Sequence, residues 1–295
     1  MNLYIVESPL QLLCAYESIL SSKTKYRLVV RLTSRGNNDT HLLSCLNLLD
    51  LEYEKLIVRP GNIKADILKN FYFLTKILFC KYKSIYIGSY YSKLLNFFSI
   101  FFNKNSIYYL DDGAATLRAQ KEVLERNKSV NWYTFFEFKK NKKQKVIKHQ
   151  FRMLTNKISK KSQFGVYFIG QPVEYMKNLS SEEYVEGINI LANNTKGEKI
   201  FYIPHRLENI EHIKKLNNIV ILNIEVPLEL FFMYESDCFP REVYSYYSTA
   251  LFTLKSIIPN VACKAIKINS NERDFLDIYE SMESQGIELI DLNRL

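Results

Sequence analysis

The chain has 295 residues, 47% of them hydrophobic, and a formal net charge of +9. This composition allows a sizeable buried core, and the length allows two ordinary domains or one large one. No apolar run is long enough for a membrane span, and the N-terminus lacks the pattern of a signal peptide. Five scattered cysteines without a C-x-x-C pair indicate neither a zinc site nor a disulfide framework, so we expect a reducing, cytoplasmic compartment.

Strands and helices alternate through the first half of the chain. Ser8 and Pro9 suit the N-cap and first turn of a helix that follows the first strand. Apolar runs predict strands at 3–6, 26–32, 54–58 and 84–88 and one ending at Asp111, and the stretches between them predict helices at 9–20, 40–49, 63–80 and 91–102. The strands read as continuous apolar runs, which is typical of parallel strands covered on both faces.

A basic segment follows an aromatic run at 132–138 that is compatible with an edge strand. From Lys139 to Lys161 there are ten Lys or Arg and no acidic residue, and we interpret this segment as the connection between two domains. Such a run is usually a solvated surface, and it could also attract anionic lipid. No nucleic-acid-binding motif accompanies it, so we expect no nucleic-acid partner.

Alternation restarts after the basic segment. Strands are predicted at 166–169, 199–203, 218–224, 243–247, 261–268 and 287–292, with helices at 181–191, from 248–250 onward and at 271–283. We therefore predict an α/β protein with two Rossmann-like domains, 1–155 and 156–295, facing across a cleft. There is no G-x-G-x-x-G after the first strand and no Walker A motif.

The pair Asp111-Asp112 with Gly113 follows a buried strand of the first half. Open α/β folds bind their ligands at the carboxyl ends of strands. Two neighbouring carboxylates repel each other, so one would serve as a base and the other would be held by backbone N–H groups. Taken alone, Asp-Asp-Gly is more often a plain turn with a helix N-cap than a catalytic motif.

Polar residues also end three strands of the second half. They are Gly170-Gln171-Pro172, Pro204-His205-Arg206 with Glu208, and Ser245 with Ser248-Thr249. Taken singly, each has a structural interpretation: a turn, a strand-end histidine or a helix cap. Their joint occurrence suits group transfer from a nucleotide sugar, with a carboxylate as base on the acceptor and donors on the leaving phosphate. One Asp-Asp pair is a poor metal site, so we expect neither a metal nor another cofactor.

The order Asp-Asp-Gly, Gly-Gln-Pro, Pro-His, Ser-Thr-Ala-Leu resembles the bacterial sialyltransferases of the lipooligosaccharide, capsule and O-antigen type. The opening Ser8-Pro9-Leu10-Gln11 is similar to their first strand-to-helix turn, and the resemblance extends from residue 3 to about 255. The family's His-Pro motif is replaced here by Pro204-His205.

The resemblance implies a GT-B fold, a CMP-sialic acid donor, inversion at the anomeric carbon and no metal. By position, Asp112 or Asp111 would be the general base, and Ser8, Pro9, Gln11 and Gly113 would lie on the acceptor side. His205 would donate to the CMP phosphate, and Ser248 and Thr249 would hold it. The remaining donor-side residues would be Gly170, Gln171, Pro172, Pro204, Arg206, Glu208 and Ser245.

Two alternatives stay open. One is a transferase that uses another CMP-activated acidic sugar such as CMP-Kdo. The other is a non-catalytic basic protein that binds membrane surfaces or nucleic acid, which would explain 139–161 but not the strand-end residues. We expect a glycan acceptor, in particular a lipid-linked one, with peripheral contact of Lys139–Lys161 at the inner membrane face. The sequence does not decide the acceptor, the linkage or the oligomeric state, a homodimer being one option.

Overall fold

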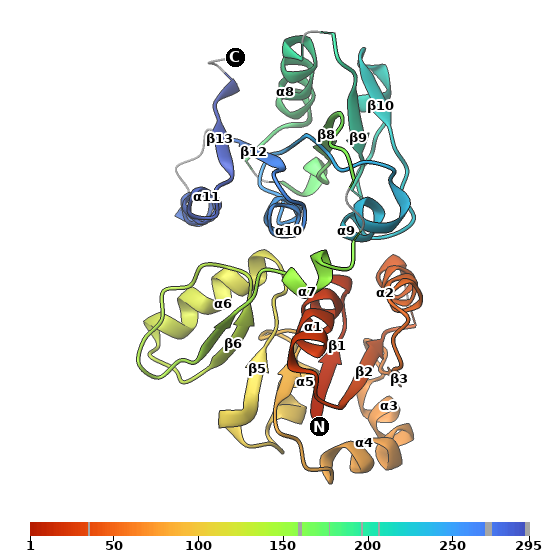
Figure 1. The fold of residues 1–295 in the computed structure, drawn as a ribbon, viewed down its shortest axis with the longest axis vertical. Helices are drawn as coiled ribbons and strands as arrows, with labels where there is room; N and C mark the ends of the chain where they lie inside the picture. The colour runs from red at the N-terminus through yellow and green to blue at the C-terminus, as the bar shows by residue number, and fades with distance from the viewer. Residues whose placement is uncertain are drawn as a thin grey trace. The chain divides into compact units, whose positions relative to one another are not determined.

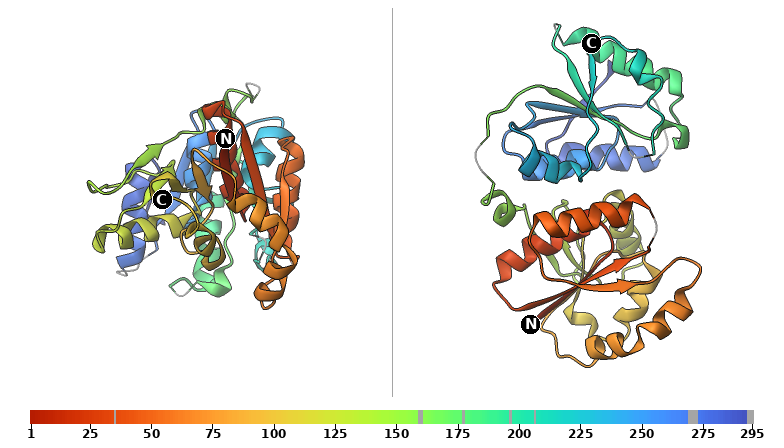
Figure 2. Two further views of the ribbon diagram at one scale, coloured as in Figure 1. Left: turned by 90° about the horizontal axis from the view of Figure 1, so that it is seen from below. Right: turned by 90° about the vertical axis from the view of Figure 1, so that its right-hand side faces the viewer.

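The computed structural model describes residues 1–34, 36–158, 161–176, 178–195, 197–205, 207–268 and 273–292. The chain divides into two compact units, Met1–Lys157 (unit 1) and Ile158–Leu295 (unit 2) (Figure 1). In each unit, helices cover both faces of a parallel sheet (Figure 2). No helix within the described ranges combines the length and the apolarity that crossing a bilayer requires.

Unit 1 is built on a seven-stranded sheet with the order β3-β2-β1-β4-β5-β6-β7, in which every pairing is parallel. Its strands are β1 (Asn2–Val6), β2 (Tyr26–Leu32), β3 (Glu54–Ile57), β4 (Ile85–Ile87), β5 (Ile107–Tyr109), β6 (Asn131–Thr134) and β7 (Val146–Lys148). Its helices are α1 (Pro9–Ser22), α2 (Asn37–Leu48), α3 (Ile63–Lys69), α4 (Phe71–Leu78), α5 (Lys93–Ser99), the 3₁₀ turn η1 (Lys104–Ser106), α6 (Ala114–Glu125) and α7 (Arg152–Thr155).

Unit 2 repeats this plan with six parallel strands in the order β10-β9-β8-β11-β12-β13. The strands are β8 (Val166–Ile169), β9 (Ile200–Ile203), β10 (Ile219–Ile221), β11 (Glu242–Ser245), β12 (Ala262–Ile266) and β13 (Glu288–Ile290). The helices are η2 (Val173–Tyr175), α8 (Ser181–Asn194), η3 (Ile213–Lys215), α9 (Leu228–Leu230), the π-helix η4 (Phe231–Glu235), α10 (Ala250–Ile257) and α11 (Arg273–Ser284).

Both sheets contain a topological switch point, where the chain leaves one strand and returns on its other side. In unit 1 this point lies between β1 and β4, and in unit 2 between β8 and β11. In such folds the helices that follow the two strands lie on opposite faces of the sheet, and ligands usually bind between them at the carboxyl edge. We call this position at the carboxyl edge the crevice of each unit. The fold therefore marks one crevice in each unit without reference to any motif.

The helix predicted at 63–80 is in fact two helices, α3 and α4. Asn70 ends the first and caps the second, and its side-chain amide donates to the carbonyls of Ile57 and Asp66. The uniform apolar pattern concealed this break, because one polar residue, Asn70, interrupts the helix through side-chain bonds to backbone carbonyls.

Two predictions on 132–161 were wrong. The aromatic run forms β6, which is not an edge strand, because β7 pairs beyond it. Most of the basic segment is not a connection either, since residues up to Lys157 belong to unit 1 and include β7 and α7. α7 is held by the Glu17 carboxylate of α1, which accepts from the N–H groups of Met153 and Leu154. Short elements of this kind leave no periodic signal.

Candidate active site

The Asp-Asp-Gly stretch lies at the carboxyl end of β5, and Gly113 is the N-cap of α6. The two carboxylates have different surroundings. Asp111 is completely buried, and its oxygens accept hydrogen bonds from the Thr134 hydroxyl at 2.7 Å and from the N–H of Phe135 at 2.8 Å. Burial raises the pKa of the Asp111 carboxyl to about 8 in spite of these two bonds.

Asp112 is only partly buried. Its N–H donates to the Thr116 hydroxyl at 2.6 Å, which fixes its backbone at the start of α6. Its Oδ1 accepts from the side-chain amide of Gln11 at 2.8 Å. Of the two acids, Asp112 is therefore the one whose carboxylate is both oriented and accessible.

Gln11 is held on both sides. Its Oε1 accepts from the N–H of Glu7 at 2.9 Å, so its Nε2 is turned towards Asp112. Only 1% of Gln11 is exposed, and a Cβ atom at Gly88 would overlap its Oε1. Gly88 directly follows β4, the strand beside β1. The Gln11 side chain therefore lies between the ends of the two strands at the switch point.

Ser8 and Pro9 have a structural role, since they form the start of α1. Ser8 is the N-cap of α1 and accepts from the N–H of Gln11 at 3.5 Å, and Pro9 opens the helix. The sequence analysis did not identify Glu7, which bonds to Arg31 at 2.7 Å and accepts from the Ser92 hydroxyl at 3.2 Å. Glu7 follows β1, Arg31 lies in β2 and Ser92 lies after β4, so no local sequence pattern connects the three residues.

His149, also missed by the sequence analysis, lies behind Asp111. Its Nε2 is 3.9 Å from Asp111 Oδ2, and its ring stacks on Tyr133 with the centroids 4.4 Å apart. Burial lowers the pKa of His149 to about 3, so the imidazole is neutral. Neither ring nitrogen has a hydrogen-bond partner among the described residues.

Cys14, Asp111 and His149 are the types of residue that could hold a metal ion. Their ligand atoms lie within 4.8 Å of one another, and all three are buried. A structural zinc ion takes four ligands, and both Asp111 oxygens already accept hydrogen bonds. We therefore assign no metal to this group.

In unit 2, three of the predicted strand ends are brought together at the second crevice, after β8, β9 and β11. The Ser245 hydroxyl is fully buried and donates to the carbonyl of Ile169 at 2.8 Å. The side-chain oxygen of Gln171 accepts from the N–H of Tyr247 at 3.3 Å. Ser245 and Gln171 thus tie the ends of β8 and β11 together and position the turns after these strands.

Ser248 and Thr249 lie at the N-terminus of α10. Thr249 is the N-cap residue, and the Ser248 oxygen accepts from the N–H of Ala250 at 3.3 Å. The Ser248 hydroxyl proton remains for an acceptor outside the helix, and the positive end of the helix dipole lies at the same place. The N–H groups of Leu251 and Phe252 already bond to the carbonyls of Ser248 and Thr249. This end of unit 2 is suited to an anionic group.

His205 follows β9 and Pro204, and it is half-buried. Its Nδ1 accepts from the N–H of Leu207 at 3.2 Å, which places the proton of the neutral imidazole on Nε2. Its own N–H donates to Glu208 at 2.9 Å. Arg206 lies outside the described residues.

Glu208 is anchored beneath this turn. One oxygen accepts from His205 N–H and the other from the Tyr202 hydroxyl, which in turn contacts the Tyr184 hydroxyl at 2.8 Å. Burial raises the pKa of the Glu208 carboxyl. A Cβ atom at Gly170 would overlap the Glu208 carboxylate, so glycine is needed there. Pro172 completes the turn as the N-cap of η2.

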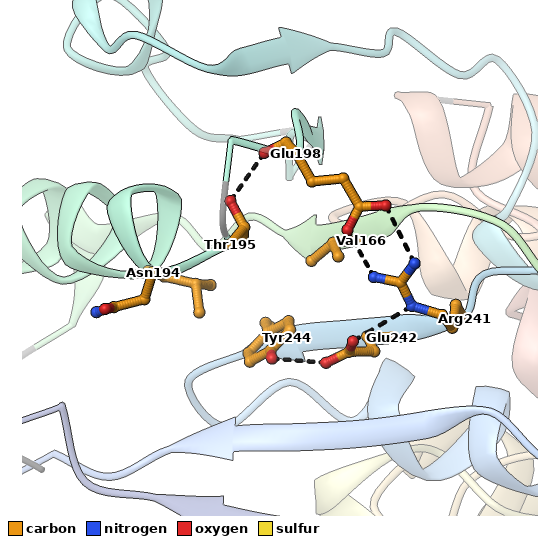
Figure 3. Close-up of a pocket in the computed structure, with 8 residues that line it drawn as sticks. Val166, Asn194, Thr195, Glu198, Arg241, Glu242 and Tyr244 are labelled. Atoms are coloured by element: carbon orange, nitrogen blue, oxygen red, sulfur yellow. Dashed lines mark hydrogen bonds and ion pairs between the residues drawn. The ribbon is translucent and has the colours of Figure 1, made fainter. Parts of the chain in front are cut away.

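A surface hollow of about 390 Å³ also occurs in unit 2, at the amino ends of β8 and β11 (Figure 3). Arg241 fills one wall and bonds to Glu198 at 2.6 Å and to Glu242 at 3.4 Å. Glu242 also bonds to Lys264 at 2.8 Å. The charged side chains that line the hollow are therefore paired. The hollow also lies at the amino edge of the sheet, opposite the edge that carries the predicted site residues.

The chain is similar in sequence to a known bacterial enzyme, although no family model matches it. Over 200 residues it is 25% identical to the CMP-N-acetylneuraminate:beta-galactoside alpha-2,3-sialyltransferase of Pasteurella multocida (strain Pm70), a match that covers 64% of this chain. The chain spans 61% of the length of that relative.

Solved structures with the same fold include an alpha/beta-galactoside alpha-2,3-sialyltransferase from Photobacterium phosphoreum, with a TM-score of 0.60, 11% identity, and coverage of 100% of this chain and 99% of that one. The UDP-GlcNAc 2-epimerase of Methanocaldococcus jannaschii gives a TM-score of 0.58 at 13% identity, with 99% and 89% covered. MurG of Acinetobacter baumannii gives 0.52 at 9% identity, with 100% and 87% covered. The predicted GT-B fold and the predicted resemblance to bacterial sialyltransferases are both confirmed.

Proposed function

We propose that the protein transfers sialic acid from CMP-sialic acid to a hydroxyl group of a surface glycan, with inversion at the anomeric carbon. The observation that carries this proposal is the sequence likeness to the Pasteurella sialyltransferase over 200 residues. The crevice residues of the two units support it, since one unit offers an oriented carboxylate and the other offers donors for a phosphate.

Asp112 is the general base in this proposal. The acceptor oxygen forms a bond to the anomeric carbon while the bond from that carbon to the CMP phosphate oxygen breaks. The acceptor proton passes to the Asp112 carboxylate, whose direction is set by the Gln11 amide. Asp111 is completely buried and has the supporting role.

Unit 2 binds the CMP part of the donor. Nε2–H of His205 donates to the phosphate as negative charge develops on it. The hydroxyls of Ser248 and Thr249 hold the same phosphate at the positive end of the α10 dipole. Glu208 and the turn at Gly170-Gln171-Pro172 line the cytidine side, and no metal ion is needed when these donors neutralise the charge.

The activity is tested with the purified chain, CMP-sialic acid and a β-galactoside acceptor such as lactose, in excess EDTA. We expect a sialylated product and the release of CMP, with CMP-Kdo giving little or none. Product formation only with CMP-Kdo would identify the other donor class. A strict requirement for Mg²⁺ or Mn²⁺ would contradict the metal-free proposal. The acceptor is proposed to be a lipooligosaccharide, O-antigen or capsule glycan.

Gln11→Glu is expected to move the acidic limb of the rate–pH profile to higher pH. Glutamate has the same shape and keeps the bond from the Glu7 N–H, but it places a second carboxyl oxygen 2.8 Å from Asp112. Two carboxyl groups at that distance share a proton, so the base is occupied at neutral pH and is freed only as the pH rises.

The matched control is Gln11→Met, which keeps the volume of the side chain and removes the polar contact. It should lower kcat at every pH without moving the profile. A profile of Gln11→Glu that coincides with that of the wild type would show that Asp112 is not the titrating base.

A further inference from the structure

Exposed apolar side chains are gathered on α3, α4 and α5 of unit 1 and on the turns that follow them. Four of them are more than two thirds exposed: Leu68 (75%), Tyr72 (71%), Phe79 (87%) and Ile100 (73%). Four further exposed neighbours are Ile63, Phe71, Phe97 and Phe101. Large apolar residues usually occur singly on the surface of a monomeric protein, and a gathering of them marks an interaction site.

These helices belong to one layer. The inner sides of α4 and α5 pack into the same core cluster, with Leu74 and Ile77 from α4 and Leu95 and Phe98 from α5 against the strands. Figure 2 shows the orange helices of this region on one face of the sheet of unit 1. The exposed side chains therefore lie on the outside of a common layer, which we call the helical surface.

The helical surface is strongly basic. Between residues 61 and 106 there are seven lysines (64, 69, 76, 81, 83, 93 and 104), one aspartate and no glutamate. That aspartate, Asp66, is buried and forms its ion pair with Arg59, at 2.7 Å, so most of the lysine charge is left uncompensated. Lys76 lies over the Tyr72 ring, with its Nζ 4.5 Å from the centroid, so a cation and an aromatic ring are paired at the surface.

We propose that the helical surface binds an anionic lipid bilayer. The aromatic and aliphatic side chains enter the boundary between head groups and acyl chains, and the lysines contact lipid phosphates. A second copy of the chain is the less suitable occupant, because a two-fold contact would place this basic surface against itself. A bilayer supplies the negative charge that a second copy lacks.

The basic segment 139–161 is less suited to a bilayer than the helical surface, because its described part lacks exposed large apolar residues and several of its lysines have partners. Its described residues include no exposed large apolar side chain. Lys148 bonds to Glu137, Lys157 donates to the Tyr16 hydroxyl, and Lys161 donates to the carbonyl of Phe232. Lys139, Lys140, Lys142 and Lys143 are exposed without apolar neighbours of this kind, so we place the membrane contact on the helical surface instead.

The benefit for catalysis rests on the proposed function. If unit 1 takes the acceptor, binding of its helical surface to a bilayer holds the enzyme at a lipid-linked glycan. The binding itself needs neither donor nor acceptor and is measured without them.

The full chain is sedimented with vesicles of phosphatidylcholine and phosphatidylglycerol at 3:1 and with phosphatidylcholine alone. We expect binding to the anionic vesicles that weakens as salt is added. The variant Leu68→Ser/Phe79→Ser/Ile100→Ser should lower the affinity at least about tenfold, as expected when three large apolar contacts are removed. The control Phe164→Ser/Leu276→Ser, which removes exposed apolar residues of unit 2, should bind like the wild type.

A melting curve checks that the triple variant is folded, and Lys69→Glu/Lys76→Glu/Lys81→Glu tests the same surface if it is not. Equal binding of both surface variants and the wild type would overturn the proposal. Loss of binding only in Lys139→Ala/Lys140→Ala/Lys142→Ala/Lys143→Ala would transfer the contact to the basic segment. A dimer that the triple variant dissociates, without vesicle binding by the wild type, would identify a second copy as the occupant. Sialylation of a soluble acceptor is unaffected by any of these outcomes.

Discussion

Asp112→Asn is expected to lower kcat by about 10²–10⁴-fold, the usual effect of removing a general base, and to leave CMP binding almost unchanged. The substitution keeps the shape of the side chain and removes the proton acceptor. CMP affinity is measured by calorimetry and kcat by release of CMP.

Asp111→Asn is the matched variant, and we expect it to keep the fold and much of the activity. The carboxyl of Asp111 has a pKa of about 8 because it is buried, so at pH 7 it is mostly neutral and an amide is close to isosteric with it. The Phe135 N–H and the Thr134 hydroxyl can both remain bonded to an amide. Full activity of Asp112→Asn together with an inactive, folded Asp111→Asn would reverse the assignment.

Comparison of Asp111→Asn with the wild type also tests the effect of the Asp111 carboxyl on stability. In the folded protein the pKa of Asp111 lies above the ordinary value of 3.8, so the folded state holds this proton more tightly than the unfolded state. The resulting stabilisation is complete below about pH 4 and is lost as the pH rises through about 8. Over this window the melting temperature of the wild type should fall relative to that of Asp111→Asn. The nearby groups Asp112, Cys14 and His149 are present in both proteins, so the difference between the two melting temperatures reports on Asp111.

His205→Ala is expected to lower kcat by about 10²–10³-fold, the scale of losing one well-placed donor, with a much smaller change in KM for CMP-sialic acid. In the proposed mechanism the Nε2–H of His205 donates to charge that develops only as CMP leaves, so its contribution would be larger in the transition state than in the ground state. Steady-state kinetics with varied CMP-sialic acid measures both constants.

Ser248→Ala is the comparison for His205→Ala and should show a weaker effect of the same kind, because Thr249 and the dipole of α10 remain. A melting curve on each variant confirms folding. If His205→Ala raises only KM, or lowers the melting temperature without lowering kcat in the folded fraction, His205 is a binding or structural residue.

The sequence by itself determined the two α/β units and the strand ends at which polar residues occur. Strand and helix signals are local. A run such as Leu3–Val6 is apolar throughout because it is buried on both faces, and Ser8-Pro9 is a favoured N-cap and first position of a helix. The positions of Asp112, His205 and Ser248 after their strands follow from these signals alone.

Only the tertiary structure decided which of the two aspartates is accessible. Asp111 is buried by Thr134 and Phe135, more than 20 residues away, and Asp112 is oriented by Gln11, 101 residues before it. The basic segment became part of unit 1 for the same reason, since Glu17 of α1 holds α7. Burial and hydrogen bonding between distant segments depend on strand order, and no period or spacing in the sequence encodes that order directly.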